Sequence, residues 1–262
     1  MSEHLRFDIN EKVATIRIDR PEKLNAFTDD MLLAWVDALE ECRSSDAVNV
    51  IVITGTGGAF TTGGDTTGFA KSAASTSAGI RHRLTDFIHR LPLKLDEIDK
   101  PVIAALNGIA TGGGLDIALM CDMRYAAQSA RFAETYASLA LIPGLGGAYL
   151  LPRLIGTPRA RELLWSADFI DAQEAERIGL VNRVYPDDEL MDRTYEYAGR
   201  IANASPLAIR LIKRMTRQDA HTDLRAALDL AASNMSVVRG GEDHDEALRA
   251  LKERRPPQFK GK

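Results

Sequence analysis

Two apolar runs, each followed by a glycine-rich turn, constrain the fold of this chain more than any other feature. The run VNVIVITG (48–55) is almost continuous in β-branched residues, and PVIAALNG (101–108) is a second apolar run. Such runs are typical of strands that are covered on both faces of a sheet. Because helices must supply that cover, we expect the α/β fold class.

The rest of the first half continues this alternation of strand and helix signals. The run VATIRID (13–19) alternates apolar and polar residues, as a half-buried strand does. Thr28 can cap a helix that we expect to continue to about residue 44. A further helix is expected at about 79–98, and a short strand at 122–127.

The second half is mainly helical. Helical patterns dominate after residue 187, so we expect a spiral α/β core over 1–195 and a helical region over 196–262. The helical region has a long apolar face that must pack on something, and a trimer or larger oligomer would cover it. This face includes Leu224, Leu228, Ala231 and Met235.

Charge and cysteine content argue against several classes of function. A formal net charge of -4 lacks the basic excess that a nucleic-acid surface requires. Cys42 and Cys121 are far apart and fit neither a metal-binding spacing nor a disulfide framework, so we expect buried free thiols. No run is long and apolar enough to span a membrane, and the first ten residues lack a signal-peptide pattern. A soluble cytoplasmic protein is therefore expected.

Each of the two apolar runs leads into a turn with consecutive glycines and an aspartate, GGAFTTGGD (57–65) and NGIATGGGLD (107–116). Glycine lets the backbone approach a ligand closely and direct N–H groups at it. The ligand could be a nucleotide phosphate or a carbonyl that becomes an oxyanion; alternatively, the glycines only allow close packing. Neither turn has a phosphate-loop pattern, and Asp65 and Asp116 would repel a phosphate. Two such turns favour an oxyanion hole, where losing one donor costs about 2.7–4 kcal/mol.

Longer segments of the chain carry a family resemblance. They are RPEKLNAF, AFTTGGD, KPVIAALNGIATGGGLDIALMCDMRYAA, ARFAETYASLALIPGLGGAYLLPRLIG, AERIGLVNRVYPDDEL and LKERRPPQFKGK. In order and spacing, nearly from end to end, they resemble the crotonase (enoyl-CoA hydratase/isomerase) superfamily.

The resemblance implies a spiral of ββα units, a C-terminal helical trimerisation region, and trimers often paired into hexamers. It also implies an acyl-CoA thioester substrate, with no cofactor beyond the CoA moiety, and places the two oxyanion donors on the N–H groups of Gly64 and Gly113. Asp65 then fits a turn or helix cap better than a reagent. The CoA-binding positions fall on Lys23, Leu24 and Ala26 and, in a tail that can belong to a neighbouring subunit, on Phe259 and Lys260.

At the catalytic positions the sequence departs from the hydratases. Enoyl-CoA hydratases of this family use two glutamates that flank one water, and here those positions are Asp116 and Tyr136. Aspartate is one methylene shorter, a retreat that can cost about 10²-fold in rate, and a phenol with an ordinary pKa near 10 is normally a donor. We therefore expect a lyase or isomerase of this family that is not an efficient two-glutamate hydratase. Glu134 is expected to point to another side, into solvent or a salt bridge.

Several roles stay open. The site suits double-bond isomerisation, specialised hydration, thioester or β-diketone hydrolysis, or decarboxylation, and a catalytically silent acyl-CoA-binding subunit is the alternative. Gly144 stands where relatives used in isomerisation or aryl-CoA dehalogenation have aspartate, which disfavours both. Asp116 is either an acid/base or only a helix-start residue, and Tyr136 either forms a hydrogen bond or lines a pocket wall. His82 and His89 share a helical face that we expect to be partly exposed, although one of them could reach the pocket.

Overall fold

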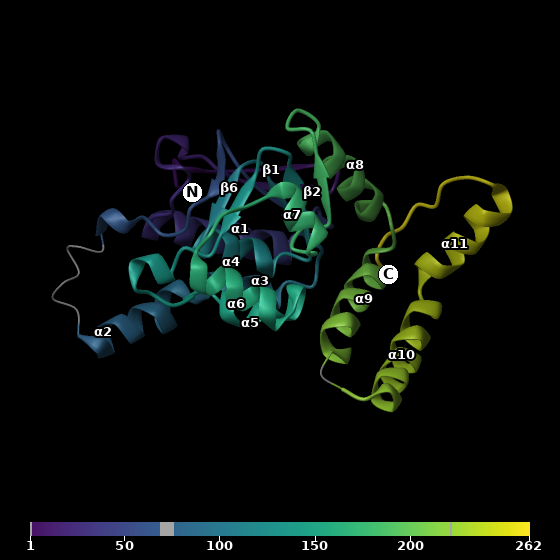
Figure 1. The fold of residues 1–262 in the computed structure, drawn as a ribbon. Coiled ribbons are helices and arrows are strands. Elements are labelled where there is room, and N and C mark those ends of the chain that lie inside the picture. The colour runs from purple at the N-terminus through teal and green to yellow at the C-terminus, as the bar shows by residue number, and fades with distance from the viewer. Residues whose placement is uncertain (1, 69–75, 221) are drawn as a thin grey trace.

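The computed structural model of the protein describes residues 2–68, 76–220 and 222–262 (Figure 1). Its core contains two sheets, of six and four strands. The six-stranded sheet has the order β1-β2-β3-β5-β7-β10, in which only the β1–β2 pair is antiparallel. Its strands are β1 (Leu5–Asn10), β2 (Val13–Ile18), β3 (Val50–Gly55), β5 (Val102–Leu106), β7 (Met123–Ala127) and β10 (Arg183–Tyr185).

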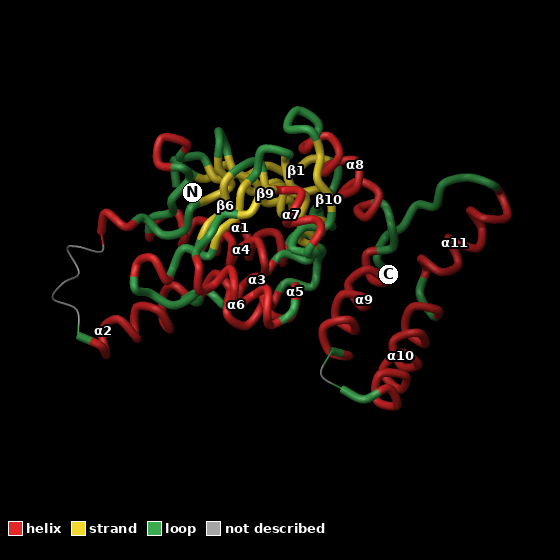
Figure 2. Tube along the Cα trace, viewed as in Figure 1, coloured by secondary structure: helices red, strands yellow, loops and turns green. Residues whose placement is uncertain are grey.

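Every residue of β3 and β5 is buried, which confirms the two apolar runs as strands covered on both faces. The helix α8 (Leu190–Ala202) packs across β2, β3, β5 and β7 on one side. Figure 2 shows the helices α4 (Gly113–Met120), α5 (Gly147–Ile155) and α6 (Thr157–Ser166) along the other side of the strands. The α/β fold class is therefore confirmed.

The second sheet supplies the second strand of the ββα units that the resemblance implied, although the positions of its strands were not predicted. It has the order β4-β6-β8-β9, with strands β4 (Ala59–Thr61), β6 (Ile109–Thr111), β8 (Arg131–Ala133) and β9 (Ile170–Asp171). Strands of two or three residues are too short to show the period-two alternation that identifies a strand in a sequence. The chain passes from β3 to β4 and from β5 to β6 around tight corners, which produces the repeating ββα units of a crotonase-like spiral.

Glycine makes these corners possible. A Cβ atom on Gly55 would lie 2.3 Å from the Ala59 carbonyl oxygen, and one on Gly108 would lie 2.1 Å from the Gly58 carbonyl oxygen. Real Cβ atoms do not approach backbone oxygens so closely, so a larger residue would force the two sheets apart.

The first helices follow the sequence pattern with one local change. In α1 (Asp29–Ser44) the Thr28 side chain accepts a hydrogen bond from the Met31 N–H at 3.3 Å, which confirms the predicted cap. The helix expected at 79–98 is divided into α2 (Ser77–His82), a π-helical segment and α3 (Arg90–Glu97). In the π-helical segment the His89 N–H donates to the carbonyl five residues back.

The chain ends in helices that extend to one side of the core (Figure 1). They are α9 (Pro206–Asp219), α10 (Leu224–Arg239) and α11 (Glu242–Glu253). The short α7 (Ala172–Arg177) precedes them and packs in the core instead. In α10, Leu224, Leu228 and Met235 are well exposed, with 75, 61 and 59% of their surface accessible, so the apolar face remains uncovered in one chain. The expected boundary at residue 195 falls inside α8. Trimer or hexamer formation through this region stays a prediction.

Both cysteines, Cys42 and Cys121, are buried free thiols, as predicted. Burial raises the pKa of each thiol to about 12, so neither is a ready nucleophile. Within the three described ranges, no helix is long and apolar enough to span a membrane.

Candidate active site

The two glycine turns meet at one place. β4 and β6 are parallel neighbours, so the turns that follow them lie side by side. A Cβ atom on Gly63 would lie 3.1 Å from the Gly113 nitrogen, and one on Gly114 would lie 2.0 Å from the Thr61 carbonyl oxygen. Gly63 and Gly112 also have φ angles of +90° and +49°, which other residues rarely adopt. The glycines therefore allow the two turns to pack closely and also give the backbone a conformation that can direct N–H groups at a ligand. The two interpretations of these glycines do not exclude each other.

The turns present two N–H groups of interest. Gly113 is the first residue of α4, so its N–H has no acceptor within the helix. Gly64 forms a parallel bridge with Phe27 in which Phe27 donates to Gly63 and Asp65 donates to Phe27. Neither the Gly64 nor the Gly113 N–H donates a hydrogen bond to another residue in the described part of the chain.

Asp116 lies directly behind this turn. It is completely buried, and its Oδ2 atom accepts hydrogen bonds from the Tyr136 hydroxyl at 2.7 Å and the Leu145 N–H at 3.2 Å. Its carboxylate therefore accepts hydrogen bonds from outside its own helix, while Asp116 itself lies in the first turn of α4, where a negative charge also favours the helix start.

Tyr136 stands between Asp116 and the glycine turn. Its hydroxyl would lie 3.5 Å from a Cβ atom on Gly113, and its ring approaches Gly112. Tyr136 is half-buried, whereas Asp116 has no exposed surface. Of the two open interpretations, the structure therefore supports a hydrogen-bonding role, with the hydroxyl as the Tyr136 atom nearest the Cβ position of Gly113.

The prediction for Glu134 was wrong. This residue follows the last residue of β8, is completely buried, and lies beside Asp116 instead of in solvent or a salt bridge. Neither Glu134 carboxyl oxygen, nor Asp116 Oδ1, has a hydrogen-bond partner among the residues that the structure describes. The chain turns immediately after the strand, so spacing from Tyr136 could not predict the direction of this side chain. The only indication in the sequence was that a second carboxyl-bearing residue, Glu134, lies two positions before Tyr136.

Burial controls the protonation of these three groups. It raises the pKa of Glu134, and the neighbouring Asp116 charge raises it further. Burial also raises the pKa of Asp116, although the hydrogen bonds from Tyr136 and Leu145 act in the opposite direction. The pKa of Tyr136 is raised by burial and by the Asp116 charge. Each of these groups therefore keeps its proton up to a higher pH than the same group on a protein surface would.

Comparison with known proteins identifies the family. The Enoyl-CoA hydratase/isomerase family pattern matches residues 8–262. The chain belongs to this family. It is 36% identical to a crotonyl-CoA hydratase of Syntrophomonas wolfei over 98% of each chain, and 30% identical to a 1,2-epoxyphenylacetyl-CoA isomerase of Escherichia coli over the whole of each chain. A solved enoyl-CoA hydratase from Bacillus anthracis is 34% identical, with a TM-score of 0.91 over 99% of this chain and 100% of that one.

The residues predicted to bind CoA in this family form two groups. Lys23, Leu24 and Ala26 lie beside the Gly64 turn, since the Thr62 N–H donates to the Leu24 carbonyl at 3.2 Å. Lys23 is exposed and Leu24 is 47% exposed, so both side chains are accessible to a ligand.

The predicted tail residues lie elsewhere. The Lys260 N–H donates to Asp243 of α11 at 2.7 Å, and Phe259 is half-buried beside it. The structure therefore holds Phe259 and Lys260 at the helical region, and their approach to CoA from a neighbouring subunit stays a prediction.

Asp65 has the structural role that was predicted. Its carboxylate accepts hydrogen bonds from the Thr67 N–H at 2.9 Å and from Arg20 at 2.6 Å. These bonds hold the pKa of Asp65 well below its usual range. Asp65 thus ties the Gly64 turn to the segment that contains Lys23.

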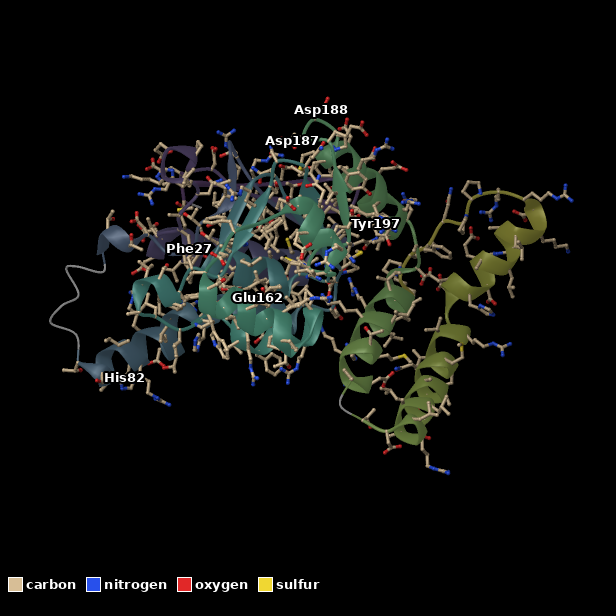
Figure 3. The ribbon with its side chains drawn as sticks, in the orientation of Figure 1. Phe27, His82, Glu162, Asp187, Asp188 and Tyr197 are labelled. Atoms are coloured by element: carbon tan, nitrogen blue, oxygen red, sulfur yellow. The ribbon has the colours of Figure 1, made fainter. Side chains whose placement is uncertain are left out.

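The two histidines differ in position. His82 is exposed beside Asp86 at the last residue of α2, well apart from Phe27 in Figure 3. His89 is half-buried, and its Nε2 atom lies 2.9 Å from the Gly144 carbonyl oxygen, in the loop before Leu145. His89 thus contacts the edge of the site, but it does not join the Asp116 cluster. Among the described residues, no group of three or more His, Cys, Asp or Glu could hold a metal ion.

Gly147, the first residue of α5, gives a sharp test of this geometry. A Cβ atom there would lie 2.0 Å from Asp116 Oδ1 and 3.2 Å from Glu134 Oε1, so Gly147→Ala must displace the Asp116 carboxylate. We expect kcat to fall by about 10²-fold, the usual effect of a displacement of about 1 Å. Gly199→Ala in α8 is the matched control because its Cβ meets nothing within 4 Å. Equal kcat for the two variants, measured on any substrate of the enzyme, would contradict the assigned geometry.

Proposed function

We propose that the protein forms and protonates the enolate of an acyl-CoA thioester. In this proposal the N–H groups of Gly64 and Gly113 bind the thioester oxygen, and the Tyr136–Asp116 pair moves the proton at the α-carbon. Lys23, Leu24 and Ala26 line the path of CoA, and Phe259 and Lys260 of a neighbouring subunit complete it in a trimer or hexamer.

One observation carries this proposal: the Tyr136 hydroxyl donates to Asp116 at 2.7 Å directly beside the Gly113 backbone. An oxygen bound at Gly64 and Gly113 would bring its α-carbon close to that hydroxyl. Two preorganised N–H donors stabilise the negative charge that develops on the oxygen when the α-proton leaves. A carboxylate with a raised pKa, connected through a phenol, is a suitable proton acceptor near neutral pH.

The same arrangement is unfavourable for rapid hydration. Asp116 has no exposed surface and is covered by Tyr136, so its carboxylate cannot hold a nucleophilic water directly. Proton transfer at carbon needs no such water. The relatives include one protein named as a hydratase and one named as an isomerase. Both names are compatible with a reaction that passes through an enolate.

We expect crotonyl-CoA hydration at least about 10²-fold slower than by a two-glutamate hydratase, since one glutamate position holds the shorter Asp116 and the other holds Tyr136. The loss of enone absorbance measures this rate. A panel of acyl-CoA thioesters followed by mass spectrometry then shows whether the product arises by isomerisation, hydration, hydrolysis or decarboxylation. Fast crotonyl-CoA hydration would contradict the account of Tyr136. Binding without any product would contradict the enzyme proposal and indicate an acyl-CoA-binding subunit.

A further inference from the structure

The proposed function does not use Glu134, although this carboxyl is completely buried next to the site. Asp116 Oδ1 and Glu134 Oε1 both lie close to the Gly147 α-carbon, 2.0 and 3.2 Å from the position of a Cβ atom on it. These are also two of the buried oxygens that have no hydrogen-bond donor within the described ranges. Two unsatisfied carboxyl oxygens thus lie around one point.

A shared proton resolves this arrangement. Two ionised carboxylates are acceptors only, so neither can satisfy the other. If Glu134 holds a proton, it can donate to Asp116 Oδ1, while Tyr136 and Leu145 donate to Oδ2. A buried polar group without a partner is unfavourable. Two carboxylates that lie side by side repel each other, so one of them tends to keep its proton. Burial and the Asp116 charge both raise the pKa of Glu134, which agrees with this assignment.

Few other groups can influence this pair. The charged group that acts on Glu134 is Asp116 from α4, and both carboxyls act on Tyr136 in the turn after β8. From the loop before α5 and from its first residue the pair is approached by backbone, at Leu145 and Gly147, and the N–H groups of both lower the pKa of Asp116. A proton on the pair therefore responds mainly to Asp116, Tyr136 and any bound substrate.

We infer that Glu134 is a positioning residue that shares one proton with Asp116, so that the pair acts as the base behind Tyr136. This inference rests on the proposed function for its chemical role. When the α-C–H bond breaks, its proton passes to the Tyr136 oxygen, and the Tyr136 proton passes to Asp116 Oδ2. The C–H electron pair enters the enolate. The return of one proton along the same route re-forms a C–H bond, and the pair alternates between one and two protons.

The variant Glu134→Gln distinguishes a Glu134 that shares a proton with Asp116 from a Glu134 that only donates a hydrogen bond to it. The glutamine amide can donate to Asp116 Oδ1 at any pH, but it cannot release a proton. In the wild type, loss of the shared proton leaves two repelling carboxylates, so activity should fall at alkaline pH. We expect Glu134→Gln to lose this alkaline limb of the pH profile of kcat/KM, whereas Gly199→Ala should keep it. An alkaline limb unchanged in Glu134→Gln would overturn the inference.

A second measurement does not depend on activity. The pKa of Glu134 is raised by folding, so the folded protein holds a proton that the unfolded chain releases. The free energy of unfolding should therefore fall as pH rises from the ordinary glutamate range to the raised pKa. Urea unfolding between about pH 5 and 9 should show this decline over the whole range in the wild type, whereas in Glu134→Gln only the part up to about pH 6, which the raised pKa of Asp116 contributes, should remain. In Asp116→Asn the decline should end at lower pH, because the neighbouring charge is gone.

The outcomes distinguish the two proposals. Parallel unfolding profiles for the wild type and Glu134→Gln would overturn the shared proton, whatever the turnover. A decline that Asp116→Asn leaves unchanged would show burial alone, and would also overturn it. The expected decline in a protein that converts no thioester would contradict the proposed function and leave the shared proton supported.

Discussion

Asp116→Asn is expected to lower turnover by about 10²–10⁴-fold, the usual contribution of a general acid or base. Asparagine keeps the shape of the side chain, and its amide oxygen can still accept the Tyr136 hydroxyl. It cannot, however, accept the proton that leaves the α-carbon. CoA binding should be intact because Lys23 and Leu24 lie on a separate segment beside the Gly64 turn.

Steady-state turnover on the active thioester, with the Kd of CoA from calorimetry, measures both parts of this prediction. Gly199→Ala controls for substitution as such, and thermal unfolding establishes that the variant is folded. Unchanged kcat in Asp116→Asn would make Asp116 a structural residue and remove the base from the proposed mechanism.

Tyr136→Phe is expected to have a comparable effect, a loss of about 10²-fold or more in kcat. The variant removes the hydroxyl that lies between Asp116 and the Gly113 backbone, while the ring continues to fill the same space. It also removes the hydrogen bond that opposes the effect of burial on Asp116, so the pKa of that carboxyl should rise.

This change in pKa has a defined direction in the pH profile. A higher pKa leaves Asp116 protonated up to a higher pH, so the acidic limb of kcat/KM should move toward alkaline pH. The profile, measured with the same thioester in wild type and Tyr136→Phe, tests this shift. Wild-type kcat with an unmoved acidic limb would mean that Tyr136 is only a wall of the pocket.

The elements that could be predicted are those with a long local pattern. The continuous β-branched run of β3 is unambiguous in a sequence, and Thr28 precedes a helix with a clear apolar face. The meeting of the two glycine turns was also predictable, since each follows a strand of one sheet. The side chains packed behind the turns could not be placed in this way, because their positions depend on tertiary contacts.

Glu134 is the main example of this limit. A glutamate is normally exposed, and nothing in its neighbours along the chain indicates burial against Asp116, which is 18 positions away in sequence. The positions of the short strands of the second sheet were missed for a related reason: two or three residues form strands there because partners are already in place. The same sheet brings β8 beside β6 and so carries Glu134 to the site.

Exchange of α-protons tests the central claim most directly, because it detects the enolate without requiring a complete reaction. The protein is incubated in D₂O with the thioester that binds best in the panel, and the mass of the recovered thioester is measured. The account predicts that the wild type incorporates deuterium at the α-carbon and that Asp116→Asn and Tyr136→Phe do so far more slowly. Binding without deuterium incorporation by the wild type, or equal incorporation by all three proteins, would contradict it.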